Sequence, residues 1–320
     1  MNAENPNTCL VTISDAEFSI GTEVLLYSIH KFNPDFDGDI VVICEDLPDS
    51  DRQRIASVSP ARFQAPDDRL RQAVENLRSH EPRLDDIYRR LFSLEAFRFS
   101  DYDRVVYLDS DIYCQGDISS LFAADEPLLA CADGFTYADR IDERLSEGEA
   151  GQLRERYGRR MSGSFNAGVL SISPRKLGAS IYEELLSWLE PERWKSMGPG
   201  KFTDQMLLNI HFNGDFACLE AIYNYMVFLE GYQKIAEGAA FVDARLVHFA
   251  GSLKPWFEYE PEMLARRAPQ CFKAFDAWRE LLDQARGPID EEETRRRFSA
   301  HQDWISSYNS NPIKPTGRIY

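Results

Sequence analysis

Short apolar runs alternate with amphipathic stretches over the first part of the chain. The runs Cys9–Ile13 and Asp39–Cys44 are rich in β-branched residues and have the length of buried strands. A strand, a helix and a second strand in succession form a parallel crossover, so the pattern predicts an α/β fold with a doubly wound, mostly parallel sheet flanked by helices. The helix between these two strands would place on one face Gly21, Val24, Leu25, Ser28, Ile29 and Phe32.

A third apolar run, Val105–Leu108, ends abruptly in Asp109, Ser110 and Asp111. Side chains two residues apart in extended backbone point the same way, so both carboxylates would face one place. In open α/β sheets, ligands bind beyond the carboxyl ends of the strands. Two carboxylates there repel each other unless a cation lies between them, and a divalent metal that carries a substrate's phosphates meets that need. The same D-x-D pattern also ends strands in solvated turns, so other parts of the chain must decide between the two.

A second polar group lies at the end of the predicted last strand, Phe241–Phe249. His248 stands near the end of this run, and Gly251 and Lys254 follow it. Gly251 allows close backbone approach, and Lys254 offers a point charge for phosphate. Two carboxylates and one imidazole would hold Mn²⁺ or Mg²⁺ and leave positions for two phosphate oxygens, and the imidazole favours Mn²⁺.

Two more predicted strands carry polar residues at their ends. Leu128–Ala132 is an apolar run followed by Asp133, and Ser164–Ile172 is an apolar run with Asn166 near its start. Because strand ends in such a sheet border the ligand site, both polar residues are candidates for it.

Two helices are predicted after these strands. The first begins at Pro174 and continues to Trp188 with apolar residues at core spacing. Thr203 would cap the second, which places Asp204 and Gln205 in its first turn. An acid in a first turn is commonly a partner of the helix dipole, so this position does not by itself establish a functional role.

Charged stretches interrupt the apolar pattern. Pro66–Asp86 is interpreted as an excursion or lid, and Tyr137–Arg160 as a loop that covers the site. A helix is predicted at Tyr88–Phe99, with Arg89 and Arg90 at its start. Paired arginines are usually solvated, but these lie directly before the acidic strand end, where a nucleotide's phosphate or ribose could contact one of them.

The pattern changes beyond Trp256. We predict a main domain of residues 1–257 and a helical C-terminal extension of residues 258–320. A second helix of the extension is predicted from Asp290, where acidic residues precede basic residues by four positions. The extension could contact the acceptor, a membrane surface or a second copy of the chain. The first helix of the extension would place on one face Cys271, Phe272, Phe275, Trp278 and Leu282.

The composition is that of an ordinary enzyme-sized globular protein. The chain has 320 residues, 43% of them hydrophobic, with a net charge of −17, which argues against a nucleic-acid partner. No stretch approaches the roughly 20 apolar residues of a membrane span, and the first residues lack the features of a signal peptide. These features predict a cytoplasmic protein, with contact at the inner face of the membrane restricted to the C-terminal helices. The six cysteines are scattered and are expected to be reduced core thiols.

Four segments of the chain resemble a known enzyme family. They are VVYLDSDIYCQGDISSLF, FNAGVLSISP, TDQMLLN and VHFAGSLKPW, and their order and distances resemble those of the retaining glycosyltransferases of family eight. That family includes glycogenin and the bacterial lipooligosaccharide galactosyltransferases. The resemblance extends from about Cys9 to Trp256. It implies a single glycosyltransferase-A type domain that binds a UDP-sugar and a divalent cation, usually Mn²⁺.

The resemblance also implies roles for individual residues. The residues that resemble the family's metal ligands are Asp109, Asp111 and His248. Those that resemble its nucleotide and diphosphate contacts are Thr12, Ser14, Arg90, Ser110, Gly251 and Lys254. Those that match the positions around the donor sugar and its anomeric carbon are Asp133, Asn166, Asp204 and Gln205.

The implied chemistry is transfer of glucose or galactose from a UDP-sugar to a glycan, a lipid-linked saccharide or a protein. Retention of configuration could arise from two displacements or from delivery of the acceptor to the face that the diphosphate leaves, and Gln205 is a poor nucleophile, which favours same-face delivery. Three alternatives stay open: a nucleotide-sugar hydrolase, an inverting glycosyltransferase or nucleotidyltransferase, and a non-catalytic nucleotide-sugar binding protein. The sequence does not decide between the two sugars or among the acceptors.

Overall fold

The structure is a computed structural model. The residues that it describes are 7–134, 136–137, 163–197, 203–257, 259, 265 and 268–286. The predicted loop Tyr137–Arg160, apart from Tyr137 itself, and the predicted helix from Asp290 lie outside these residues.

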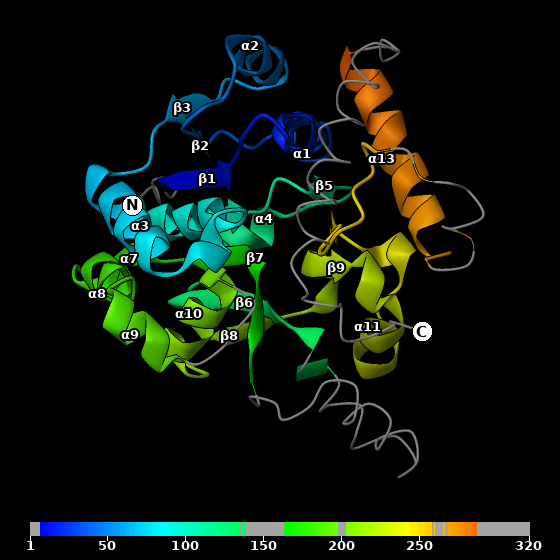
Figure 1. Ribbon diagram of the computed structural model, residues 1–320. Helices are drawn as coiled ribbons and strands as arrows, with labels where there is room; N and C mark the ends of the chain where they lie inside the picture. Colours follow the sequence, from blue (N-terminus) through cyan, green and yellow to red (C-terminus); the bar gives the residue numbers. More distant parts are fainter. Residues whose placement is uncertain are drawn as a thin grey trace, which may run out of the picture.

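A seven-stranded sheet forms the centre of the molecule (Figure 1). Its strand order is β3-β2-β1-β4-β7-β6-β8, and all neighbouring strands are parallel except that β7 runs antiparallel to β4 and β6. The expected α/β class with a mostly parallel sheet is therefore confirmed. The strands are β1 (Thr8–Ile13), β2 (Asp39–Ile43), β3 (Arg62–Gln64), β4 (Arg104–Leu108), β6 (Leu128–Ala132), β7 (Phe165–Ile172) and β8 (Ala217–Leu219).

Helices cover both faces of this sheet because its strands are apolar on both sides. In β1, Cys9 and Val11 pack into the core under α3, η2, α8 and α10, whereas Leu10 packs on the opposite face under α1 and α2. The helices of the two layers are α1 (Ser19–Phe32), α2 (Asp49–Val58), α3 (Asp68–His80), η2 (Tyr88–Phe97), α8 (Ile181–Ser187) and α10 (Thr203–Phe212). Shorter helices elsewhere include α4 (Ser119–Ala123), α9 (Pro191–Ser196) and α11 (Glu230–Glu237).

A small second sheet stands beside the carboxyl end of β4. Its order is β5-β10-β9, with β10 antiparallel to β5 and parallel to β9. The expected strand Phe241–Phe249 was too long, because Phe241–Asp243 forms a 3-10 turn, η5, and Val242 is 83% exposed. Pairing with a three-residue partner strand limits β10 to three residues. The strands of this sheet are β5 (Ile112–Cys114), β9 (Tyr225–Met226) and β10 (Leu246–His248).

The interpretation of Pro66–Asp86 as an excursion or lid was wrong. Most of this segment is α3, whose buried residues Leu70, Val74 and Leu77 are spaced by four and three positions and form one apolar stripe. Charged residues cover the other faces of the helix, so the overall polarity of the segment concealed its period.

The single helix expected from Pro174 to Trp188 is divided in two. Pro174 opens α7 (Pro174–Leu177), and Gly178 ends it with a φ of 98° before α8 begins at Ile181. A φ in this region is accessible to glycine at little cost, so the glycine stops the first helix even though the apolar spacing continues across it.

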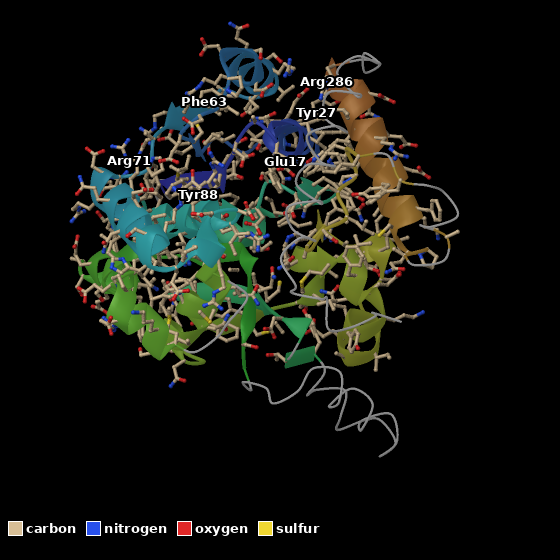
Figure 2. The ribbon with its side chains drawn as sticks, viewed as in Figure 1. Glu17, Tyr27, Phe63, Arg71, Tyr88 and Arg286 are labelled. Carbon is tan, nitrogen blue, oxygen red and sulfur yellow. The ribbon has the colours of Figure 1, made fainter. Side chains whose placement is uncertain are left out.

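The amphipathic helix expected in the C-terminal extension is confirmed as α13 (Cys271–Arg286). It lies against α1, where Arg286 and Tyr27 mark the contact (Figure 2), and the Arg286 guanidinium lies 3.3 Å from the Glu23 carboxylate. Trp278 of α13 packs against Trp256 in a shared apolar core. The division at residue 257 stays a prediction. None of the helices in the described part of the chain is both long enough and apolar enough to span a membrane.

Candidate active site

Three segments meet at the carboxyl end of β4. The main chain of Asp109 donates a hydrogen bond to the carbonyl oxygen of Gly168 in β7, at 2.9 Å. On the other side, the Phe249 N–H donates to the carbonyl oxygen of Asp111, at 3.0 Å, and extends the pairing of β5 with β10. These backbone bonds place His248, the last residue of β10, beside the two aspartates.

Asp109, Asp111 and His248 form a compact cluster. The His248 Nε2 atom lies 3.2 Å from Asp111 Oδ1 and 3.7 Å from Asp109 Oδ2. One ligand atom from each residue lies within 4.8 Å of the other two. Two carboxylates and an imidazole suit a divalent ion such as Mn²⁺, and the Asp109 side chain is 36% exposed, which leaves the cluster accessible from solvent.

The charges around the two carboxylates are unequal. Partial burial and the neighbouring Asp111 raise the pKa of Asp109 to about 6. Burial acts in the same direction on Asp111, but the Lys254 ammonium and His248 hold its pKa well below the usual range. Lys254 is itself buried, pairs with Asp111 Oδ2 and donates to the Phe249 carbonyl oxygen at 2.8 Å. Among the described residues, Asp109 therefore has no Lys or Arg paired with its carboxylate.

Tyr107 orients the first aspartate. Its hydroxyl donates to Asp109 Oδ1 at 2.7 Å, and the ring is fully buried in β4. The hydroxyl leaves Asp109 Oδ2 to face His248. The sequence analysis did not single out Tyr107, although a residue two positions before Asp109 in a strand points to the same face.

A group of side-chain amides lies next to the acidic cluster. The Asn166 Nδ2 atom donates to Gln205 Oε1 at 2.9 Å, and the Ala167 N–H donates to the same oxygen at 3.4 Å. One turn further along α10, Asn209 binds both the N–H and the carbonyl oxygen of Phe165 at 2.8 Å. This pair of bonds fastens α10 to the start of β7 and so sets Gln205 beside Asn166.

Asp204 occupies the first turn of α10, as expected. It is buried, and its Oδ2 atom accepts a hydrogen bond from the Ser93 hydroxyl in η2 at 3.1 Å. Its negative charge also contributes to the raised pKa of Asp109. Asp204 therefore belongs to the same acidic group as the cluster and is more than a partner of the helix dipole.

Asn224 was not anticipated from the sequence. It ends η3 (Ala221–Asn224), and its side chain bridges the two halves of the site: Oδ1 lies 2.8 Å from His248 Nδ1, and Nδ2 donates to Asn166 Oδ1 at 2.8 Å. No apolar period or motif surrounds it in the sequence, so only the packing of η3 against β10 reveals it.

Comparison with known proteins identifies this arrangement. Residues 9–260 match the model of a protein family described as glycosyl transferase family 8. The chain belongs to this family. The match begins and ends within a few residues of the region from Cys9 to Trp256 that showed the resemblance, so the family assignment made from the four motifs is confirmed.

Curated proteins with a related sequence include two bacterial glycosyltransferases. Glycosyltransferase GlyF of Streptococcus pneumoniae is 33% identical over 200 residues, which are 62% of this chain and 44% of GlyF. A lipopolysaccharide 1,2-glucosyltransferase of Escherichia coli is 30% identical over 183 residues, 54% of this chain and 50% of the relative. The chain thus spans about half the length of the curated relatives it matches.

The fold also matches a solved structure. The galactosyltransferase LgtC, crystallised with donor and acceptor sugar analogues, has a TM-score of 0.62 and 20% sequence identity, with coverage of 90% of this chain and 99% of LgtC. This likeness confirms the expected glycosyltransferase-A type fold.

Two further residues suggested by the family 8 resemblance, Asp133 and Ser14, follow strands that run parallel to β4 and so lie at the same edge of the sheet as Asp109. Asp133, after β6, accepts hydrogen bonds from the Ser164 hydroxyl at 2.6 Å and the Thr136 N–H at 2.9 Å. Ser14 accepts from the Thr22 hydroxyl of α1 at 2.8 Å. These bonds hold the ends of β6 and β1 in place at the same edge of the sheet.

Thr12 is fully buried near the end of β1, and its hydroxyl has no hydrogen-bond partner among the described residues. Ser110 is buried between the two aspartates, whereas Gly251 has a φ of 98° in the turn after β10. Arg90 is exposed at the start of η2, and within the described residues its guanidinium forms no ion pair. The roles that the resemblance implies for these four residues stay predictions.

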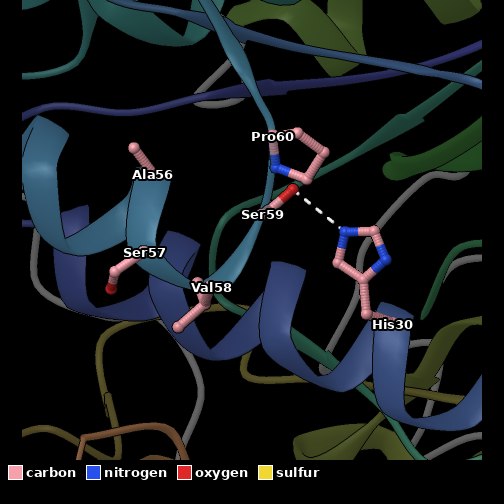
Figure 3. Close-up of a pocket in the computed structure, with 6 residues that line it drawn as sticks. All are labelled: His30, Ala56, Ser57, Val58, Ser59 and Pro60. Carbon is pink, nitrogen blue, oxygen red and sulfur yellow. Dashed lines mark hydrogen bonds between the residues drawn. The ribbon is translucent and has the colours of Figure 1, made fainter.

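A shallow hollow between α1 and α2 lies apart from the family 8 site. His30 and residues 56–60 line it, and His30 Nε2 lies 3.1 Å from the Ser59 hydroxyl (Figure 3). None of its lining residues belongs to the acidic cluster or the amide group. The ring nitrogen that faces the hollow is already paired with a hydroxyl, so this hollow offers little specific chemistry.

Proposed function

We propose that this chain is a metal-dependent, retaining glycosyltransferase that moves a glucose or galactose from a UDP-sugar to a glycan, a lipid-linked saccharide or a protein. The observation that carries the proposal is the Asp109, Asp111 and His248 cluster directly beside Asp204, Asn166 and Gln205, in a chain of family 8. The related glucosyltransferase and the galactosyltransferase of similar fold support both hexoses equally.

The residues of the cluster fit a divalent ion. Its donor set combines two carboxylates with one imidazole, and the raised pKa of Asp109 reports a negative charge that a cation would stabilise. A bound Mn²⁺ would neutralise the diphosphate as it leaves the sugar. Lys254, buried beside Asp111, supplies a further positive charge for the same group. The leaving group then needs no general acid.

The amide group favours same-face delivery of the acceptor. Gln205 Oε1 already accepts hydrogen bonds from Asn166 and from the Ala167 N–H, which makes this oxygen a still weaker nucleophile. The negative charge of Asp204 lies close by and would stabilise the positive charge that develops on the sugar. In this route the departing phosphate takes the proton of the acceptor's hydroxyl group as the new glycosidic bond forms.

The test is a screen of UDP-sugars with and without Mn²⁺. We expect UDP-glucose or UDP-galactose to raise the melting temperature only when Mn²⁺ is present. Under the same conditions we expect slow hydrolysis of the UDP-sugar, in which water accepts the sugar and UDP is released. The variant Asp111→Asn should lose both effects, whereas the control Asp117→Asn, on an exposed turn, should keep them. An unchanged Mn²⁺-dependent shift in Asp111→Asn would show that the metal binds elsewhere.

A further inference from the structure

Asn224 is held in place from both of its sides. It is fully buried, and the Gln233 side chain of α11 donates to its carbonyl oxygen at 2.8 Å and accepts from the Met226 N–H at 3.0 Å. Gln233 is also fully buried, so one amide side chain fastens the backbone on both sides of Asn224. The Asn224 side chain therefore enters the site in one defined orientation.

Backbone donors determine the direction of each bond that Asn224 makes. The Gly168 N–H can only donate, so the Asn166 atom that it meets at 3.0 Å is Oδ1. The Asn224 atom that faces this oxygen at 2.8 Å must then be the donor Nδ2. The opposite orientation of Asn224 would bring two carbonyl oxygens together. Asn224 consequently presents its own oxygen, Oδ1, to His248.

This direction decides the protonation of the His248 ring. Because Asn224 Oδ1 accepts at 2.8 Å, His248 Nδ1 must carry a proton. In the neutral ring the other nitrogen, Nε2, then has a free lone pair, and Nε2 is the atom that faces Asp109 and Asp111. Metal-binding histidines generally depend on such a bond at the second nitrogen.

We propose that Asn224 is a positioning residue that couples the metal cluster to the amide group around the donor sugar. Its oxygen keeps His248 in the form that binds a metal through Nε2, and its nitrogen fixes Asn166, whose own Nδ2 binds Gln205. The proposal rests on the proposed metal-dependent function. It goes beyond it because Asn224 itself belongs to neither the metal ligands nor the sugar-binding residues.

Two substitutions separate the two contacts of Asn224. Asn224→Leu keeps the approximate shape and removes both hydrogen bonds. Asn224→Asp keeps an acceptor for His248 Nδ1 but turns a second acceptor toward Asn166 Oδ1, so it retains only the contact with the metal ligand. Asn33→Asp is the matched control, because Asn33 is partly buried and its side chain binds Gly116 and Ile118, away from the cluster.

The measurement is Mn²⁺ affinity by calorimetry on the full chain, with Mn²⁺ alone as the probe. We expect Asn224→Leu to bind Mn²⁺ about 10- to 100-fold more weakly, as for other residues that orient a metal ligand. Asn224→Asp should bind Mn²⁺ at least as tightly as the unsubstituted chain but lose the extra affinity for a UDP-hexose over UDP. Asn33→Asp should change neither quantity.

The outcomes distinguish this proposal from the proposed function. If the unsubstituted chain does not bind Mn²⁺, the proposed function fails and the inference fails with it. If the unsubstituted chain binds Mn²⁺ and both Asn224 variants bind it equally well or equally weakly, only the role of Asn224 is refuted. Melting temperatures of all variants show whether each is folded.

A second measurement needs no substitution at Asn224. In the metal-free chain, a long-range ¹⁵N–¹H spectrum of labelled histidine should show a proton on His248 Nδ1. The sequence contains five histidines, so the signal is assigned with His248→Gln. A ring without a proton on Nδ1 would overturn the proposal even if Asn224→Leu failed to fold.

Discussion

Glu95 and Asp111 are both buried acids, but they lie in opposite kinds of surroundings. The Glu95 side chain is inaccessible to solvent, and its oxygens accept hydrogen bonds from the Asp67 N–H at 2.9 Å, the Tyr182 hydroxyl at 2.8 Å and the Arg98 guanidinium at 2.9 Å. It thus has three donors, one of them a cation. A buried acid in this position holds η2, α3 and α8 together.

Asp111 lies beside a second acid, Asp109. Lys254 and His248 lie close to Asp111, whereas Asp109 accepts a hydrogen bond from the Tyr107 hydroxyl and has a raised pKa. Burial and the neighbouring Asp111 disfavour the charged form of Asp109, so at neutral pH this carboxylate lowers the stability of the metal-free protein. The difference indicates how to separate a structural buried acid from a candidate ligand-binding acid: the hydrogen-bonding and charge needs of Glu95 are met within the fold, whereas Asp109, beside Asp111, has a raised pKa.

The largest effect on stability is expected for Glu95→Ala. The substitution leaves the Tyr182 hydroxyl and the Asp67 N–H without their acceptor and frees Arg98, which is partly exposed. We expect a loss of about 3 kcal/mol in the free energy of unfolding, measured by urea denaturation. Mn²⁺ affinity should stay unchanged. A tenfold loss of Mn²⁺ affinity in a folded variant would show that the two acidic groups are not independent.

The largest effect on metal binding outside the ligands is expected for Gly168→Ala. A Cβ atom there would lie 2.5 Å from His248 Cε1 and 2.7 Å from Asp109 Oδ2, so both side chains or the backbone between them must move. We expect Mn²⁺ affinity to fall on the order of 10- to 100-fold. Gly231→Ala is the control, because a Cβ atom there meets nothing within 4 Å. Unchanged Mn²⁺ affinity in Gly168→Ala would mean that the ligands are loosely held.

A smaller effect is expected from pH. The pKa of Asp109 is raised to about 6, so protons compete with Mn²⁺ as the pH falls through 6. We expect Mn²⁺ affinity to fall about tenfold per pH unit below that value. Calorimetry at pH 7.5 and pH 5 checks this expectation, and equal affinities would contradict it.

The raised pKa of Asp109 also makes the stability of the metal-free protein depend on pH, and here stability falls as the pH rises. A carboxyl group whose pKa is raised in the folded state binds its proton more tightly there than in the unfolded chain, so its contribution to stability is lost as the pH rises through about 6. Asp109→Asn removes this loss. The variant should therefore gain melting temperature relative to the unsubstituted chain as the pH rises from about 4 to about 6. If the melting temperatures of the variant and of the unsubstituted chain changed with pH in the same way, the raised pKa of Asp109 would be contradicted.

The smallest effect is expected for Ser93→Ala, which removes the hydrogen bond to Asp204 Oδ2. A bond to a charged group of this kind contributes about 1 kcal/mol or slightly more, so we expect the rate of UDP release from the donor to fall about fivefold. Mn²⁺ affinity should not change. Ser120→Ala, which removes a surface bond to the Tyr223 hydroxyl, is the control. An unchanged rate of UDP release in Ser93→Ala would show that this hydrogen bond to Asp204 does not affect the reaction.

Local patterns were enough to find the acidic half of the site. The apolar run of β4 and the two-residue spacing of Asp109 and Asp111 placed both carboxylates at one strand end, and the motif that contains His248 supplied the third member of the cluster. The apolar stripe of α13 was also visible in the sequence. In α3, however, the charge of the segment concealed an equally regular stripe.

The antiparallel direction of β7, the close packing at Gly168, the position of Asn224 and the contact between Ser93 and Asp204 depend on the tertiary structure. Strand direction, the approach of β10 to β5 and the meeting of η3 with β7 bring together residues that are far apart in the chain. The spacing of apolar residues along the chain shows which face of a helix or strand is buried, because that spacing follows the period of the helix or strand itself. Which side chains meet across elements is settled by packing, where a hydrogen bond forms only if the whole fold brings donor and acceptor together.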